Sequence, residues 1–185
     1  MTNENLDRFV ETAIDGFEGY PMFQYVFNGR FNAELLRRQI AIDLRTGSGT
    51  VAGVTSSEQY ESVMIISPPL VPEIGIIKYV RAIHPKDYPI FFKSATKRQV
   101  KYEKYAYKKR EGFLDDKTWY IYIFVTKNRF KRQGYGKRLI KLIKDFADTN
   151  GCRLILETDL DENIAMYEKF GFSLQHCQVM SSDFG

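Results

Sequence analysis

The chain has 185 residues, 44% of them hydrophobic and 27% charged, which is typical of one ordinary globular domain rather than of a disordered or fibrous protein. No apolar stretch is long enough to span a membrane, because the best candidate, residues 62–72, is short and broken by prolines. The net charge of +4 is a weak bias, and the two cysteines, Cys152 and Cys177, lack metal-ligand spacing. The start of the chain is polar and acidic, unlike a signal peptide, so we expect a cytoplasmic protein. The short apolar stretches predict no membrane partner, and the cysteine spacing predicts no metal site.

Two helices are expected near the start of the chain. Apolar side chains recur at three- and four-residue intervals over residues 5–17, which is typical of an amphipathic helix. Gly16, Gly19 and Pro21 are expected to end it. A second helix is expected over residues 32–44, with Asn32 as its N-cap.

The middle of the chain predicts two short strands followed by helices. The strands are expected over residues 50–56 and 61–67. The pair Pro68-Pro69 must leave the sheet, because proline donates no ladder hydrogen bond. Helices are expected over residues 70–83 and 87–110.

The last third of the chain alternates strands and helices. Residues 118–125 are aromatic and β-branched throughout, which predicts a central strand buried on both faces. A helix over residues 134–150, a strand over 153–157 and a short helix over 161–170 are expected next, followed by a strand from Phe172 onward.

A basic loop with two glycines joins the central strand to the helix after it. Its sequence is VTKNRFKRQGYGK, over residues 125–137. Backbone N–H groups at a helix N-terminus attract anions, and glycine lets a phosphate approach closely, so the loop predicts a phosphate site. A Walker A loop is excluded by Lys131 and Arg138, and a dinucleotide fingerprint by Leu139. Taken alone, such a loop more often simply begins a helix with a solvated basic face.

A second motif, NIAMYEKFGF over residues 163–172, changes this interpretation. Together the two motifs resemble the paired signature of the GNAT acetyltransferases, R/Q-x-x-G-x-G/A after the fourth strand and N-x-x-x-Y-E-K-x-G-F near the end, in both order and separation. Residues 23–27, 65–69 and 119–125 are similar to the puromycin N-acetyltransferase-like branch of that family.

The resemblance implies an α/β (α+β) fold, with a mixed central sheet flanked by helices. It implies a single domain over residues 1–185, in which residues 1–116 bind the acceptor and residues 117–185 bind acetyl-CoA. The chain departs from the family in three ways: Lys131 replaces Arg or Gln, no strand precedes the first helix, and the strands after Phe172 must be short. Either the last hairpin is abbreviated or a partner subunit supplies a strand, which would make a homodimer.

The resemblance also implies where acetyl-CoA binds. Its pantetheine arm pairs with main-chain groups in a gap beside the central strand, and its diphosphate meets the N–H groups of the glycine loop. Basic side chains of the loop add charge-assisted contacts. The implied cofactor-binding residues are Phe124, Val125, Lys131, Arg132, Gln133, Gly134, Tyr135, Gly136, Lys137, Asn163 and Tyr167.

Tyr167 holds the family's position for the catalytic acid. A phenol with a pKa near ~10 can protonate a departing thiolate whose conjugate acid has a pKa near ~8.5. An arbitrary tyrosine on a short helix is more often a packed aromatic, and here the surrounding motif favours the catalytic role.

The base that deprotonates the amine is left open, since residues 118–125 contain neither Glu nor His. Two tyrosines acting through water and two carboxylates remain as candidates: Tyr120, Tyr122, Glu157 and Asp159. The two histidines, His84 and His176, fall in no motif and are expected to be structural.

Three functions compete. The first is an N-acetyltransferase that moves an acetyl group from acetyl-CoA to a primary amine, by direct attack in a ternary complex, with a small-molecule acceptor. The second is a catalytically weak acyl-CoA-binding sensor or interaction module of the same fold. The third is a basic nucleic-acid-binding module, suggested by the basic runs at residues 97–110 and 127–144. Helical spacing spreads the charges of the first run around its axis, so we expect no nucleic-acid partner.

Overall fold

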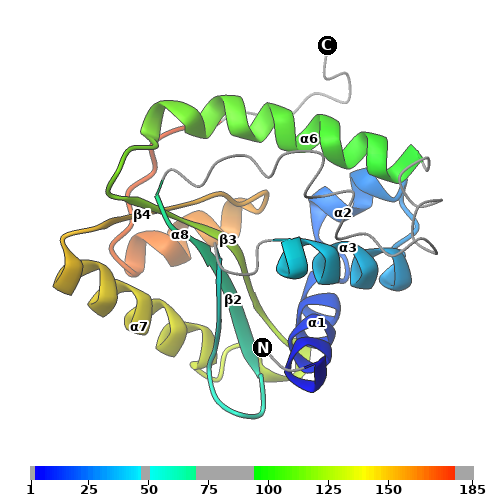
Figure 1. Ribbon diagram of the computed structural model, residues 1–185, viewed down its shortest axis with the longest axis horizontal. Coiled ribbons are helices and arrows are strands. Elements are labelled where there is room, and N and C mark those ends of the chain that lie inside the picture. Colours follow the sequence, from blue (N-terminus) through cyan, green and yellow to red (C-terminus); the bar gives the residue numbers. More distant parts are fainter. Residues whose placement is uncertain (1–2, 47–50, 70–93, 178–185) are drawn as a thin grey trace.

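The computed structural model describes residues 3–46, 51–69 and 94–177 (Figure 1). The expected helix over residues 70–83, the first residues of the helix expected over 87–110, and His84 lie outside the described residues. Within them, no helix combines the length and the apolar character that crossing a bilayer requires.

The centre of the fold is a sheet of four strands in the order β1-β2-β3-β4. β1 pairs with β2 and β2 with β3 in antiparallel fashion, whereas β3 and β4 are parallel. The strands are β1 (Ala52–Thr55), β2 (Ser62–Ser67), β3 (Thr118–Thr126) and β4 (Arg153–Leu156). This mixed sheet with helices beside it confirms the predicted fold class.

Helices cover both faces of the sheet and one end of it (Figure 1). One core joins β2 and β3 to the N-terminal helices, and a second core joins the other face to the last two helices. The helices are α1 (Asn3–Phe17), α2 (Pro21–Val26), α3 (Ala33–Thr46), α6 (Ser94–Arg110), α7 (Tyr135–Asn150) and α8 (Asp161–Lys169). Two 3₁₀ turns occupy Glu111–Phe113 and Asn128–Phe130.

The first helices follow the prediction with one correction. Asn32 caps α3, since its Oδ1 accepts a hydrogen bond from the N–H of Leu35 at 2.9 Å. Gly16 does not end α1 but lies inside it, where a Cβ would come within 2.1 Å of Val125 Cγ2 and 2.7 Å of the Thr126 carbonyl oxygen. The glycine therefore allows α1 to pack directly on β3. The sequence pattern did not predict α2, a six-residue helix that begins at Pro21.

The strand expected from Phe172 onward is wrong for residues 172–177. Gly171 adopts a positive φ of 86° after α8, and the five residues that follow Phe172 are exposed and in no ladder. Exposed residues bury no alternating apolar face, so nothing holds them as a strand. β4 is consequently the edge of the sheet in the described chain, and a groove of about 1170 Å³ lies against it.

Candidate active site

The site is centred where β3 and β4 separate. The parallel pairing ends at Ile121 and Leu156, whereas β3 continues to Thr126 along β2. A bulge coincides with this point, because Ile65 and Ile66 of β2 pair with Ile123 and Ile121 and leave Tyr122 as an extra residue. Bulges bend a strand and increase its twist. The end of β3 therefore has an edge that no strand covers among the described residues, and Phe124 and Val125 lie on that stretch.

The glycine loop follows this open end of β3. Arg132 and Gly134 both have positive φ values, 62° and 89°, which turn the chain sharply before α7. No side chain caps the N-terminus of α7, so its first N–H groups are left available to a ligand. A Cβ on Gly136 would lie 3.1 Å from Phe124 Cζ and 3.3 Å from Thr126 Oγ1, and this glycine therefore sets how closely α7 approaches β3.

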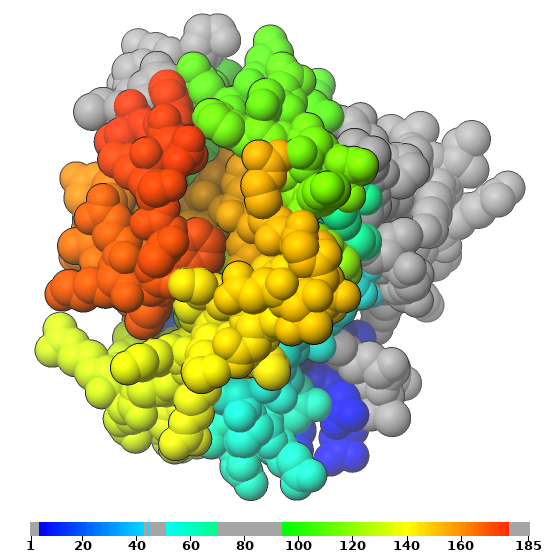
Figure 2. Space-filling model, turned by 90° about the vertical axis from the view of Figure 1, so that its left-hand side faces the viewer, coloured from blue at the N-terminus to red at the C-terminus, as the bar shows by residue number. Residues whose placement is uncertain are grey.

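The side chains of the loop point into solvent. Lys131, Arg132, Gln133 and Lys137 are exposed, and Tyr135 is half-buried. None of the ion pairs in the described part of the chain involves Lys131, Arg132 or Lys137. Figure 2 shows the loop, in yellow-green, projecting below the α8 segment, in orange. Uncapped amides at a helix N-terminus and unpaired cations are both groups that attract an anion.

Tyr167 lies beside the end of β3 and is only 9% exposed. Its ring centroid is 6.3 Å from that of Phe124 and 5.9 Å from that of Phe172. Because Phe124 also touches the Gly136 position, Tyr167 is one side chain away from the glycine loop. Its hydroxyl forms no hydrogen bond with the described residues, and burial raises its pKa, so that it remains a protonated phenol.

Asn163 lies one helical turn before Tyr167 on α8. Its Nδ2 donates a hydrogen bond to Thr158 Oγ1 at 2.9 Å, and the residue lines the same cavity as Tyr167. The structure thus brings the predicted residues of β3, the glycine loop and α8 to one place.

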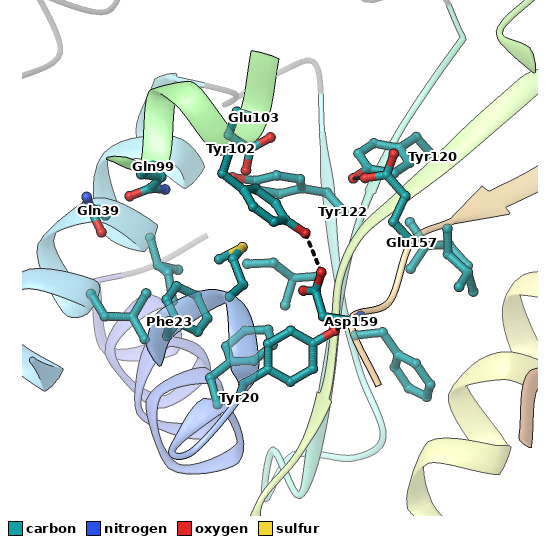
Figure 3. Close-up of a pocket in the computed structure, with 18 of the residues that line it drawn as sticks. Tyr20, Phe23, Gln39, Gln99, Tyr102, Glu103, Tyr120, Tyr122, Glu157 and Asp159 are labelled. Carbon is teal, nitrogen blue, oxygen red and sulfur yellow. Dashed lines mark hydrogen bonds between the residues drawn. The ribbon is translucent and has the colours of Figure 1, made fainter. Parts of the chain in front are cut away.

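A cavity of about 110 Å³ opens beside Tyr167 and Asn163 (Figure 3). Its described lining comes from α1, α2, α3, α6, β3, the end of β4 and α8, and it is largely aromatic and apolar. The polar side chains of this lining are Tyr20, Gln39, Gln99, Tyr102, Glu103, Tyr120, Tyr122, Glu157, Asp159, Asn163 and Tyr167.

Two of the lining carboxylates differ in their partners. Glu157 Oε2 accepts hydrogen bonds from Arg110 Nη1 at 3.2 Å and from the Tyr120 hydroxyl at 3.1 Å. Asp159 Oδ1 accepts one from the Tyr102 hydroxyl at 2.8 Å, and Asp159 has no cationic partner in the described chain. Its backbone N–H donates to the Tyr20 hydroxyl at 2.9 Å, which fixes the turn before α8.

Burial raises the pKa of both carboxyls. For Glu157 the neighbouring Arg110 works in the opposite direction, and for Asp159 the hydroxyls of Tyr102 and Tyr20 do so. Glu103 on α6 completes the acidic group, and burial likewise raises its pKa, with Arg110 opposing. No group of His, Cys, Asp and Glu side chains in the described chain is arranged to hold a metal ion.

The inward face of α6 was missed by the sequence pattern. The helix belongs to a basic run, yet Tyr102 is buried, and the partly buried Glu103 lines the cavity. Arg110 is also partly buried and lines the groove beside β4. One signal in the sequence could have indicated this inward face. Glu103, the single acidic residue of the run, lies seven positions before Arg110, which places the two on one helix face.

The comparison with family models agrees with this geometry. Residues 101–172 match the model of the acetyltransferase (GNAT) family. No curated protein matches the chain, and the narrower similarity to the puromycin N-acetyltransferase-like branch stays a prediction. The GNAT match includes α6 from Lys101 onward, β3, the glycine loop, α7, β4 and α8, so the cavity wall from Tyr102 to Tyr167 lies within it. The match supports acyl-CoA-dependent acetyl transfer as the general chemistry of this domain.

Proposed function

We propose that the protein transfers the acetyl group of acetyl-CoA to a primary amine of a small molecule. The observation that carries the proposal is that the cavity holding Asp159 and Tyr167 lies where β3 and β4 part, and that Phe124 of its lining also contacts the uncapped start of α7 at Gly136. An anion site, an uncovered strand edge and a proton donor thus adjoin one small chamber.

The residues at this place fit acetyl-CoA. The N–H groups at the start of α7 suit its diphosphate, and the exposed Lys131, Arg132 and Lys137 add positive charge. The uncovered stretch of β3 at Phe124 and Val125 offers main-chain groups to the amides of its pantetheine arm. Acetyl-CoA supplies the acetyl group as a thioester, whose carbonyl carbon accepts the amine.

Asp159 and Tyr167 provide the two proton transfers. The amine arrives as a cation, and Asp159 takes a proton from it, which exposes the nitrogen lone pair. A carboxylate with a raised pKa and no cationic partner is a better base than Glu157, which Arg110 holds. As the N–C bond forms and the C–S bond breaks, the Tyr167 hydroxyl donates a proton to the departing sulfur. The nitrogen, which is positively charged once the N–C bond has formed, then loses its second proton, and this proton passes through solvent to the Tyr167 phenolate. Asp159 gives the first proton to solvent, so that one proton is released overall.

The size and lining of the cavity support a small-molecule acceptor. Its volume is about 110 Å³, and aromatic side chains from α1, α2 and β3 enclose it. Such a chamber suits a short amine with an apolar body.

The test measures thiol release from acetyl-CoA with a panel of small primary amines, together with the mass of each product. We expect at least one amine to be acetylated well above the uncatalysed rate, and Asp159→Asn to lower kcat by roughly 10²-fold or more. Asp116→Asn is the matched control, because this residue is exposed and away from the cavity. Binding of acetyl-CoA without thiol release for any amine would favour the alternative, an acyl-CoA-binding sensor of GNAT fold.

A further inference from the structure

Two amide oxygens in the cavity have no hydrogen-bond partner in the described part of the chain. Gln39 Oε1 on α3 and Gln99 Oε1 on α6 are fully buried atoms without a hydrogen bond, and both residues line the cavity. Gln39 is only 7% exposed as a residue. In Figure 3 the two glutamines lie together at one side of the cavity, whereas Tyr120 and Glu157 lie at the other.

Orphaned buried acceptors indicate a missing donor. Native proteins leave few buried polar atoms unpaired, because each costs about 1–3 kcal/mol of desolvation. Here two such atoms come from different helices and converge on one hollow. A ligand group with several N–H donors satisfies both at once. An ammonium has three donors, whereas a hydroxyl has one.

The charges of the cavity favour a cation at this end as well. Glu103 lies four residues after Gln99 on α6, so the two side chains share a helix face. The nearest cation to Glu103 is Arg110, whose Nη2 is 4.0 Å from Glu103 Oε2, and this guanidinium also binds Glu157. Glu103 and Glu157 therefore share one guanidinium, Asp159 pairs with no cation in the described chain, and no basic side chain belongs to the described lining.

The wall between the two polar ends is mainly aromatic and apolar. Phe17, Phe23 and Ile123 belong to the described cavity wall, and none offers a polar group to a ligand. Tyr102 lies between the glutamines and Asp159, and its hydroxyl donates a hydrogen bond to Asp159 (Figure 3). A ligand that matches this order has a donor at each end and a short hydrocarbon spacer between them.

We propose that the acceptor is a small diamine, an inference that rests on the proposed function and names its substrate class. One amino group reaches Asp159 and accepts the acetyl group. The other donates hydrogen bonds to Gln39 Oε1 and Gln99 Oε1, beside Glu103. The spacer lies against the aromatic wall.

The test is calorimetric binding, which requires no acetyl transfer. Diaminoalkanes of increasing length are titrated into the protein with CoA present, beside 1-aminoalkanes and amino alcohols of the same length. We expect the best diamine to bind roughly tenfold or more tightly than its matched monoamine, since hydrogen bonds from a charged donor are the stronger ones. The amino alcohol is expected to fall between them.

The variants Gln39→Met and Gln99→Met keep side-chain length and remove the acceptors. We expect each to reduce the preference for the diamine several-fold while the monoamine binds as before. Equal affinity of diamine and monoamine, the absence of any amine binding, or a preference that survives in both variants would overturn the inference.

The two proposals fail separately. Diamine preference without thiol release would refute acetyl transfer and keep the selectivity of the cavity. Acetylation with the same kcat/KM for diamine and monoamine would keep the transferase and refute the diamine.

Discussion

Burial has opposite consequences for the two side chains that we propose transfer protons. Tyr167 and Asp159 both have raised pKa values because the cavity excludes water from them. A raised pKa keeps the phenol protonated at neutral pH, so that it serves as a donor. A raised pKa also makes the Asp159 carboxylate a stronger base, because it brings the pKa of the carboxyl closer to that of the substrate ammonium. One apolar environment thus prepares both the acid and the base.

The role of Tyr167 is tested by Tyr167→Phe. The hydroxyl has no hydrogen-bond partner among the described residues, and the ring packs on Phe124 and Phe172, so its removal leaves the packing intact. We expect kcat to fall by roughly 10²-fold, because a positioned proton donor contributes 10²–10⁴-fold to rate, with little change in the Kd of acetyl-CoA or in Tm. Steady-state kinetics, calorimetry and thermal melting measure the three quantities. An unchanged kcat would assign Tyr167 a packing role alone.

Two glycines set the distances between elements at the site. Gly16 lets α1 approach β3, and Gly136 lets the N-terminus of α7 approach the same strand. Together with the bulge at Tyr122, these contacts fix where β3 bends, where its edge is uncovered and how far the uncapped amides of α7 lie from it. The site is therefore a product of how closely elements pack, and not only of which side chains they carry.

Gly136→Ala tests this packing. Its Cβ would come within 3.1 Å of Phe124 Cζ and 3.3 Å of Thr126 Oγ1, so the ring or the helix must move. We expect the Kd of CoA to rise roughly 5- to 20-fold by calorimetry. The free energy of unfolding should change by less than about 1 kcal/mol, since alanine favours the helix by a similar amount. Gly112→Ala is the control, because a Cβ there meets no atom within 4 Å. Equal Kd values for the two variants would contradict this account.

Local sequence patterns predicted most helices and strands. Features that depend on pairing between segments distant in sequence could not be predicted. The spacing of apolar residues predicted α1, α3 and α7 because each helix buries one face. The glycine loop was predicted because Gly134 and Gly136 come shortly after the central strand in the sequence, so that the motif is local. The bulge at Tyr122 depends on the register with β2, a strand distant in sequence, and no local signal carries it. A six-residue helix such as α2 is too short to show a period.

The grouping of acidic side chains in the cavity also depends on contacts between segments that are distant in sequence. Glu103 and Asp159 come from α6 and from the turn before α8, and only the fold places them in one chamber. Residues 157 and 159 were named as candidate bases because they follow β4, whereas the partner of each, Arg110 or Tyr102, lies on a helix interpreted as a solvated basic surface.

For the molecule as a whole, this acidic group lowers stability at neutral pH. Three carboxyls with raised pKa values each contribute stability that is fully present below the pKa of the unfolded chain. That contribution is lost as the pH rises through the higher pKa of the folded state. Carboxylates that we propose bind a cationic substrate thus lower the stability of the fold, which is a common relation between stability and function.

Glu103→Gln tests this relation without touching the proposed acid or base. Glu103 has one weak partner, Arg110 at 4.0 Å, and glutamine keeps its shape without the charge. We expect the variant to unfold with a free energy about 0.5–1 kcal/mol higher than the parent near pH 7. The difference should vanish near pH 4, where the parent carboxyl is protonated. Denaturant unfolding at the two pH values measures it, with the exposed Glu111→Gln as control. A variant less stable than the parent near pH 7 would mean that attraction to Arg110 outweighs the cost of burying the carboxylate.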